Sequence, residues 1–372
     1  MRAPLVRTGL VASAVLLVFS GFCEPAGSLG NQIISLIGIQ VNSIAFKIKD
    51  LPAVNHGADV WGLDFSPDGN RIAAGSGYQV DIWDWKTNRA ETTLKLPQGA
   101  NPLLVTNPLH FSPDGKLLAV SVSKALGNVT TRIWKTRDWT TAVDIVDAQI
   151  GIVSAAAFTP DGSYLVSAVN RIGEPTDNFI VRKTSGWEIE WSLKLNLFTP
   201  MSMSISPDGR WAACGGTLTE VPPAGITDIA ERLRRTRERP QIQIVDMRQR
   251  KVATTLNGSA VGPVTWSPDG HRIAVAGLGY VEFFDSRSGS PLLHEPAEGT
   301  THINVEFSPD GRFFLDSDMN GKGTGRGLQI WDQARHKMLQ HIQGNIKSIA
   351  MSPDSRYLAA GGTGGTTLWQ IQ

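Results

Sequence analysis

The densest cluster of charged side chains lies in residues 216–241, GTLTEVPPAGITDIAERLRRTRERPQ. Ile226, Ile229, Ala230 and Leu233 have the spacing of one face of a helix. Five arginines occupy the far half of the segment, where cations suit the carboxyl end of a helix: Arg232, Arg234, Arg235, Arg237 and Arg239. We interpret the segment as a short helix that docks on a partner protein or an anionic group. The alternative is a solvated helix whose apolar stripe packs on the rest of the protein.

A second cluster could hold a cation. Asp316, Asp318 and Asn320 alternate before a glycine in the stretch DSDMNGKGTGRG, which resembles the first half of a calcium loop. The glutamate that would close such a loop is missing, because Gly327 stands at its position. A calcium site would therefore need backbone or water oxygens, and a glycine-rich polar loop without metal is the alternative.

The sequence contains no catalytic signature: no nucleophile elbow, phosphate loop or dinucleotide fingerprint, and no metal-ligand spacing among its histidines. Cys23 and Cys214 are the only cysteines, which excludes a disulfide scaffold and a multi-cysteine metal site. The formal net charge is +1, so the chain has no bulk attraction for nucleic acid. We expect a non-enzymatic protein without a cofactor, calcium being the one exception considered.

The N-terminus has the features of an export signal. Arg2 and Arg7 precede residues 9–22, which are largely apolar, uncharged and too short to span a bilayer comfortably. Small residues follow at Ala26 and Ser28, and we expect cleavage after Ser28. The alternatives are an uncleaved membrane anchor over residues 1–28 and a lipid on Cys23. The predicted location is periplasmic or secreted, with membrane contact only through this segment if it is uncleaved.

One tetrapeptide recurs along the rest of the chain. Ser66-Pro67-Asp68-Gly69 has counterparts that end at Gly115, Gly162, Gly209, Gly270, Gly311 and Ser355, spaced 46, 47, 47, 61, 41 and 44 residues apart. Proline at the first central position, aspartate at the second and glycine at the end suit a tight turn between antiparallel strands. The sequence therefore predicts seven copies of one β unit.

Each turn is preceded by a short apolar strand, such as Val60 to Phe65, and followed by a strand of small residues, such as Ile72 to Gly75. A third strand ends in an aromatic or aliphatic residue, and a fourth is more polar. Four strands in each unit of 40–45 residues make one blade of a β-propeller.

This combined pattern resembles the WD-repeat family, over about 330 of the 372 residues. The resemblance implies an all-β, seven-bladed propeller over residues 43–372, with tryptophans as wedges between blades: Trp83, Trp134, Trp331 and Trp369. The family's Gly-His pair survives only as Asn55-His56, and Gly77-Tyr78 replaces the aspartate of its turn. We therefore expect its buried network of histidine, hydroxyl, aspartate and tryptophan to be mostly absent.

The last blade lacks a fourth strand, because the chain stops after the third. Residues 43–50 form a strand with no blade of its own, so we expect it to pair beside residues 366–371 and close the ring. Residues 29–42 would be a lead-in segment without an assigned position.

The variation in length lies between second and third strands, and in the connection at residues 97–107. In such propellers these connections share one face with the blade-to-blade connections, and loops on a rigid scaffold carry binding. We therefore expect an exported or membrane-tethered interaction scaffold that binds a protein through this rim. The alternatives are an enzyme or small-molecule binder acting at the axial channel mouth, and a structural subunit of a membrane complex. The channel candidates are Asn55, His56, Asp59, Asn107, His302 and Asn304.

Overall fold

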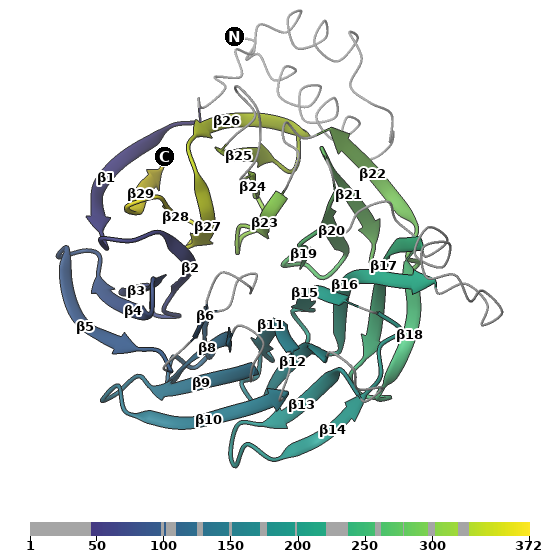
Figure 1. Ribbon diagram of the computed structural model, residues 1–372. Helices are drawn as coiled ribbons and strands as arrows, with labels where there is room; N and C mark the ends of the chain where they lie inside the picture. The colour runs from purple at the N-terminus through teal and green to yellow at the C-terminus, as the bar shows by residue number, and fades with distance from the viewer. Residues whose placement is uncertain are drawn as a thin grey trace, which may run out of the picture. The chain divides into compact units, whose positions relative to one another are not determined.

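The described part of the computed structural model is a ring of seven antiparallel β-sheets (Figure 1). It comprises residues 46–97, 100–101, 109–124, 129–148, 151–171, 177–197, 199–220, 237–256, 262–277, 279–296, 302–318 and 327–372. These residues belong to one compact unit, Phe46–Gln372. Within these ranges no helix is long and apolar enough to cross a membrane. The expected lead-in at 29–42 and the segment 1–28 lie outside the described residues.

The first three blades follow the chain in order. Blade one consists of β2 (Val60–Phe65), β3 (Arg71–Ser76), β4 (Gln79–Asp84) and β5 (Arg89–Lys95). Blade two consists of β6 (Ala100–Asn101), β7 (Leu109–Phe111), β8 (Leu117–Lys124), β9 (Val129–Lys135) and β10 (Thr141–Ala148). Both β6 and β7 pair with β8, so the inner strand of this blade is split. Blade three consists of β11 (Gly151–Phe158), β12 (Tyr164–Arg171), β13 (Phe179–Lys183) and β14 (Ile189–Leu193).

The remaining blades repeat the pattern. Blade four consists of β15 (Thr199–Ile205), β16 (Trp211–Glu220), β17 (Arg237–Asp246) and β18 (Lys251–Leu256). Blade five consists of β19 (Val264–Trp266), β20 (Arg272–Ala276), β21 (Tyr280–Asp285) and β22 (Pro291–Pro296). Blade six consists of β23 (His302–Phe307), β24 (Phe313–Asp318), β25 (Gly327–Asp332) and β26 (Lys337–Gln343). Blade seven consists of β27 (Ile346–Met351), β28 (Tyr357–Gly362), β29 (Gly365–Ile371) and β1 (Ile48–Asn55).

The two ends of the described chain close the ring, as the sequence predicts. β1 pairs antiparallel with β29, with Ile48 opposite Ile371 and Asn55 opposite Gly365. The bounds differ from the expected 43–50, because the strand continues to Asn55. Val54, outside the expected strand, is 5% exposed and packs in an apolar cluster between blades seven and one. Burial of this side chain explains why pairing extends beyond Asp50.

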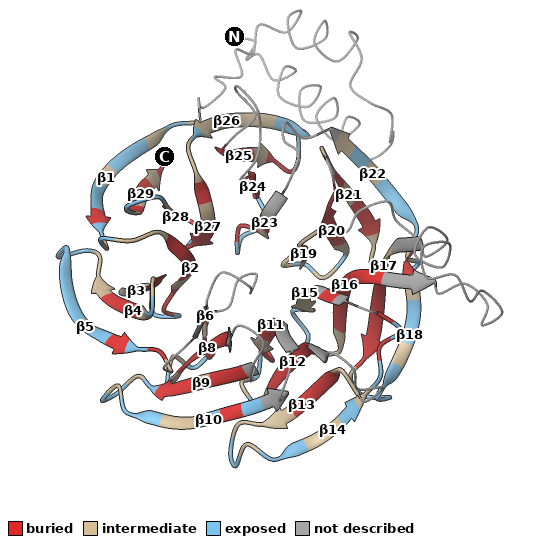
Figure 2. Cartoon of the chain, viewed as in Figure 1, coloured by how far each residue is buried: buried red, intermediate tan, exposed pale blue. Residues whose placement is uncertain are grey.

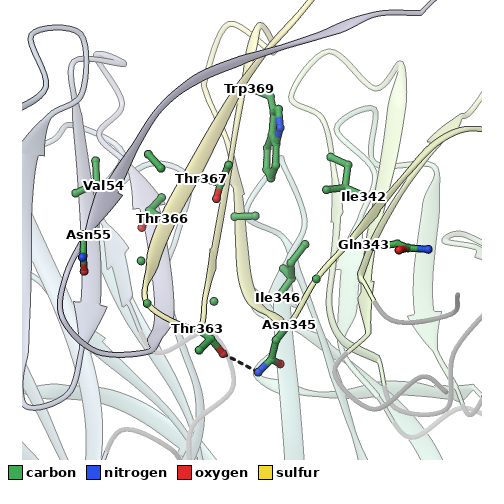
Figure 3. Close-up of a pocket in the computed structure, with 16 residues that line it drawn as sticks. Val54, Asn55, Ile342, Gln343, Asn345, Ile346, Thr363, Thr366, Thr367 and Trp369 are labelled. Carbon is green, nitrogen blue, oxygen red and sulfur yellow. Dashed lines mark hydrogen bonds between the residues drawn. The ribbon is translucent and has the colours of Figure 1, made fainter. Parts of the chain in front are cut away.

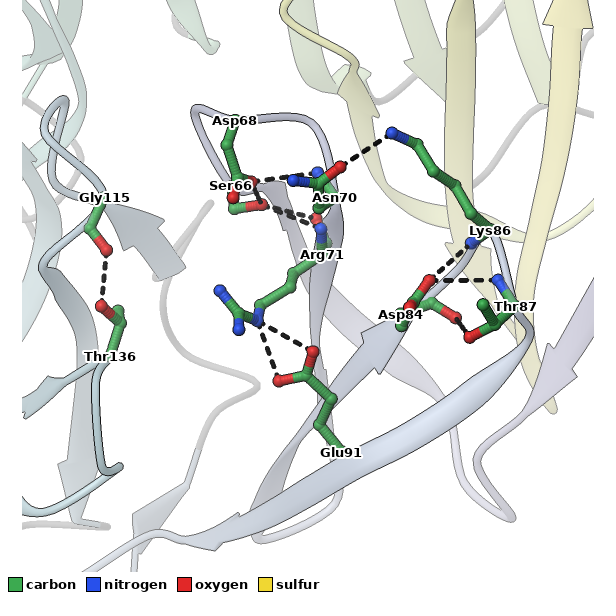
Figure 4. A network of polar contacts seen from close by, with 10 residues as sticks. All are labelled: Ser66, Asp68, Asn70, Arg71, Asp84, Lys86, Thr87, Glu91, Gly115 and Thr136. Atoms are coloured by element: carbon green, nitrogen blue, oxygen red, sulfur yellow. Dashed lines mark hydrogen bonds and ion pairs between the residues drawn. The ribbon is translucent and has the colours of Figure 1, made fainter.

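The repeated turns have the hydrogen bonds that their residue types predict. In blade one the Ser66 hydroxyl donates to Asp68 (2.6 Å) and accepts the Arg71 N–H (2.9 Å), while Gly69 has φ +66° (Figure 4). Asp68 accepts hydrogen bonds from the Ser66 hydroxyl and from the Asn70 backbone N–H. These bonds lower the pKa of the Asp68 carboxyl, although its partial burial acts in the opposite direction. In blade seven Ser355 replaces the glycine at φ +58°, and its hydroxyl accepts the Asp310 N–H of blade six (3.1 Å). This contact between blades offsets the strain of a non-glycine residue there.

The apolar core lies between the blades rather than within them. Figure 2 shows the middle strands mostly buried and the outermost strands mostly exposed. Trp134 lies in a cluster shared by blades one and two, and Trp369 in one shared by blades six and seven. Trp83 and Trp331 are partly buried against the clusters next to their own blades. Each of the four tryptophans therefore packs between neighbouring sheets.

Because Val54 joins the last blade to the first, we predict that Val54→Asp lowers the free energy of unfolding by about 3 kcal/mol or more, since it buries a charge without a partner. Ala53→Asp is the matched control, because Ala53 is exposed on the same strand. Urea unfolding would measure both. Equal effects of the two substitutions would contradict closure by β1.

Candidate functional site

The connections between strands separate onto two faces of the ring. The Ser-Pro-Asp-Gly turns and the turns between third and fourth strands form one face, which we call the turn face. Connections between second and third strands, and between blades, begin and end on the other, which we call the loop face. The alternation of strand direction in each antiparallel blade requires this separation. All the long connections therefore start from the loop face, including residues 221–236 between β16 and β17.

The predicted arginine cluster divides at the start of β17. Arg232, Arg234 and Arg235 lie outside the described residues, as does the expected helical stripe. Arg237 and Arg239 belong to β17, where their backbones pair with Glu220 and Leu218. The expectation that these two extend a helix is therefore wrong: the β16–β17 ladder continues to both ends of the connection, satisfying backbone groups that a helix would have satisfied.

The predicted calcium ligands are also partly in a strand. Asp316 and Asp318 lie in β24, with backbone partners Gln329 and Gly327, and are 0% and 1% exposed. Two of the three expected loop ligands are thus within the sheet, and Asn320 lies outside the described residues. Among the residues that the structure places, no group of three histidine, cysteine or acidic side chains could hold a metal ion. The calcium site remains a prediction.

A polar cleft of about 390 Å³ lies on the loop face at blade seven (Figure 3). Its walls include Asn55, Asn345 and the segment Gly362–Thr367. The Asn345 amide donates to the Thr363 hydroxyl (2.8 Å), while its buried carbonyl oxygen has no partner within the described structure. A Cβ on Gly362 or Gly365 would lie 2.2 or 2.1 Å from a backbone oxygen, so close backbone packing requires glycine at both positions. The glycine-rich run Gly361 to Gly365 was the available sequence signal for this cleft.

A buried polar network joins blade seven to blade one. His56, whose side chain is 1% exposed, hydrogen-bonds Asp81 (3.0 Å) and the Thr366 hydroxyl (3.1 Å) through its two ring nitrogens. The Thr93 hydroxyl donates to Asp81 (2.7 Å), and the Trp83 ring packs edge-on to His56. Such a network is expected to be mostly absent; a partial one forms here, because Asp81 of β4 supplies the carboxylate that the turn lacks, while the Trp83 Nε1 has no hydrogen-bond partner among the described residues. Hydrogen bonds from His56, Thr93 and Gln79 lower the pKa of Asp81 and outweigh its burial.

The network has the order of a hydroxyl, histidine and carboxylate triad, but its hydroxyl is inaccessible. Thr366 is 2% exposed, so its oxygen cannot meet a substrate carbonyl in this arrangement. The three side chains come from β29, the β1–β2 connection and β4. We therefore assign them a structural role, which is to fasten the closing blade to the first.

A second cavity, of about 320 Å³, lies on the axis of the ring. In every blade the residue two positions before the serine or threonine of the turn lines this cavity. These seven residues, which we call the axial ring, are Asp64, His110, Ala157, Ser204, Thr265, Glu306 and Ala350. The two acidic members belong to blades one and six, with Ala350 of blade seven between them.

Both axial carboxylates accept backbone hydrogen bonds from the next blade. Asp64 accepts the Phe111 N–H (2.7 Å), and Glu306 accepts the Met351 N–H (3.4 Å). Burial raises the pKa of Asp64 to about 7, against the lowering effect of its hydrogen bonds. Burial and the nearby Asp64 charge raise the pKa of Glu306 to about 8. His110 Nδ1 lies 4.0 Å from Asp64 Oδ2.

The channel residues expected from sequence are distributed over several places. Asn304 lines the axial cavity, whereas Asn55 lines the loop-face cleft and His56 lies in the buried network. Asp59 forms an ion pair with Lys347. Asn107 and the side chain of His302 lie outside the described structure. The acidic residues of the axial ring were missed, although their fixed distance from each turn was a usable signal.

Two comparisons with known proteins agree with the propeller architecture. The family model for the WD domain, G-beta repeat, matches residues 49–84 and 334–369. The first match covers all but one residue of β1 and all of β2 to β4, and the second covers β26 to β28 and most of β29. The chain is also 23% identical over 335 residues to a guanine nucleotide-binding protein subunit beta from Solanum tuberosum, covering 82% of this chain and 78% of that protein. The family matches therefore fall on the two segments that close the ring.

The axial carboxylates give a pH prediction. Their pKa values rise from ordinary values of 3.8 and 4.5, so between about pH 4 and pH 8 the folded protein binds more protons than the unfolded chain. Their contribution to the free energy of unfolding therefore falls as the pH rises through this window. We expect the double variant Asp64→Asn, Glu306→Gln to be more stable than the wild type at pH 8.5 by about 2 kcal/mol or more, with the gain absent at pH 4.

Urea midpoints at several pH values would measure this difference. Asp50→Asn is the control, because Asp50 is an exposed carboxylate on β1 that does not line the axial cavity. Parallel profiles for the wild type and the double variant would contradict the prediction, because they would show that folding does not raise the pKa values of the axial carboxylates.

Proposed function

We propose that this chain, which is a WD-repeat β-propeller, holds another protein on its loop face. WD-repeat propellers commonly serve as protein-interaction scaffolds, and the relative from Solanum tuberosum is by its name a subunit of a larger protein. The observation that carries the proposal is the asymmetry of the two faces. Every repeated turn on the turn face is a closed tetrapeptide, whereas the long connections all leave from the loop face.

The loop-face cleft supports contact with a polar segment of a partner. Its wall offers the amide and hydroxyl groups of Asn55, Asn345 and Thr363, and the unpaired Asn345 carbonyl oxygen can accept a hydrogen bond. A buried acceptor without a partner costs free energy that a donor from a bound chain would recover. The cleft therefore favours a partner that presents backbone or side-chain N–H groups.

The β16–β17 hairpin supports a contribution from the arginine cluster. Its two strands are ten residues long, and Glu220 pairs with Arg237 where residues 221–236 begin and end. This ladder would extend the connection from the blade, where its arginines could meet an acidic surface. We propose that Arg232, Arg234, Arg235, Arg237 and Arg239 contact the partner there.

We also propose that the protein is exported and works in the periplasm, or outside the cell, with residues 1–28 as a cleaved signal or a membrane tether. The support is the basic start, the apolar stretch 9–22 and the small residues that follow.

The loop-face proposal predicts that a shortened hairpin loses partner binding. Because Glu220 and Arg237 face each other in an antiparallel ladder, Asn-Gly can replace residues 221–236 as a two-residue turn without disturbing the blade. We expect this variant to bind the native partner at least ten-fold more weakly, measured by affinity capture from the native compartment followed by titration of the purified partner. Changing the five arginines to glutamine should give an intermediate loss.

The matched control is Arg335→Ala, which removes an exposed arginine paired with Asp332 on the turn face. It should leave binding unchanged. If the shortened hairpin binds every partner as well as the wild type does, the loop face is not the binding surface at this blade.

The export proposal predicts that the mature protein begins at Leu29. Mass spectrometry of protein purified from the native compartment should give the mass of residues 29–372, and Ser28→Arg should leave the precursor uncleaved. An intact Met1 on soluble cytoplasmic protein would contradict export, whereas an intact segment in the membrane fraction would identify the tether.

A further inference from the structure

The axial ring is chemically uneven although its seven positions are equivalent. Blades three and seven contribute methyl groups, blades four and five hydroxyls, blade two the imidazole of His110, and blades six and one carboxylates. The cavity also contacts Pro160, a turn residue, so it reaches towards the turn face rather than the cleft of the proposed partner site. The small Ala350 between Glu306 and Asp64 leaves both carboxylates facing one space.

The structural task of these carboxylates does not require a charge. Ser204 occupies the same ring position in blade four, and its hydroxyl accepts the Trp266 N–H of blade five (3.2 Å). Asp64 and Glu306 accept the corresponding N–H groups of their own neighbours. Since a neutral oxygen makes this bond in one blade, the two charges need another explanation.

Among the described residues Glu306 forms no ion pair, and Asp64 has only His110 beside it, with His110 Nδ1 4.0 Å from Asp64 Oδ2. No lysine or arginine lines the cavity, whose wall combines polar side chains such as Ser204 with apolar ones such as Val305 and Ile349. Oε2 of Glu306 accepts no hydrogen bond from the described residues. Carboxylates in such surroundings favour a cation that enters with its own hydrogen-bond donors.

Asn304 provides an independent observation at the same cavity. The side chain lines the cavity and is 8% exposed, and its amide nitrogen donates to the Lys347 carbonyl oxygen (2.9 Å). That bond orients the amide group, and its Oδ1 receives no hydrogen bond from the described residues. An acceptor without a donor among the described residues therefore lines the same cavity as the two carboxylates.

We propose that the axial cavity binds an organic cation, an ammonium or guanidinium group, between Asp64, Glu306 and Asn304. The carboxylates and the Asn304 oxygen accept its N–H groups, and the alanine and aliphatic walls contact its methylene stem. A metal ion fits less well, because the placed residues offer no group of three metal-ligating side chains. The site is separate from the loop face, so its test does not require a bound partner there.

Cation binding must compete with protons at these carboxylates. Because the pKa values of Asp64 and Glu306 are raised to about 7 and about 8, the ligand displaces protons when it binds below pH 8. We expect affinity for the cation to be at least ten-fold greater at pH 8.5 than at pH 6.5. Binding near neutral pH should release protons to the buffer.

The experiment uses the full chain and isothermal titration calorimetry with agmatine, with the tripeptide Gly-Arg-Gly and with calcium chloride. Titration in two buffers of different ionisation enthalpy measures proton release. Agmatine binding alone would identify a free amine, and tripeptide binding would identify an arginine side chain; either supports the site when Glu306→Gln weakens it at least ten-fold. Glu295→Gln is the control. Glu295 lies on the outer strand β22, where it pairs with His336, so this substitution should not affect binding.

Three results would overturn the proposal: no binding of either organic cation at pH 8.5, unchanged binding by Glu306→Gln, or calcium binding that Glu306→Gln removes. Glutamine keeps an oxygen for the Met351 N–H, so we expect this variant to fold, which circular dichroism would check. If it does not fold, Asp64→Asn takes its place, because asparagine keeps an oxygen for the Phe111 N–H, and unchanged binding of both organic cations by that variant would overturn the proposal.

Discussion

The pairing of β1 with β29 is the constraint on which the rest of the structure depends. A blade shares its apolar surface with two neighbours, so a ring lacking one strand would leave a sheet edge and part of a core uncovered. Here β1 supplies that last strand, although its residues lie more than 300 positions before their partners in β29. The His56 network with Asp81 and Thr366 joins blades seven and one through polar groups. Residues of both β1 and β29 line the loop-face cleft, so the shape of the cleft depends on the pairing of these two strands.

Repetition also explains how a uniform scaffold carries different chemistry on its two faces and its axis. The turn face is constrained because each hydroxyl, aspartate and glycine there completes a local hydrogen-bond pattern. Substitution is tolerated where a residue finds a compensating contact, as Ser355 does with Asp310. The axial ring has no such local requirement beyond an acceptor in some blades, so its side chains can differ from methyl to carboxylate without changing the fold.

The sequence predicted the fold well because its strongest signals are local. Seven turn tetrapeptides and their flanking strands determine the blades. The last blade lacks a fourth strand beside β29, and this gap pointed to a strand early in the chain. The bounds of that strand were displaced, because Val54 is buried by blades that are distant in sequence. The network around His56 was missed because Asp81 acts from a strand position instead of the turn. Arg237 and Arg239 were misplaced because the apolar spacing of residues 226–233 was extended as a helix to the end of the segment, where the β16–β17 ladder has already begun.

The axial ring links binding to the integrity of the closure. Asp64 bonds blade one to blade two, and Glu306 bonds blade six to blade seven, so the two acids flank the blade that β1 completes. At neutral and higher pH their charges oppose folding, because burial favours the neutral carboxyl. A cation between them would remove this cost and stabilise only the folded ring, by an amount that grows with its concentration relative to its dissociation constant. Occupancy of the axis would thereby be coupled to the strength of the ring on which the loop face is built.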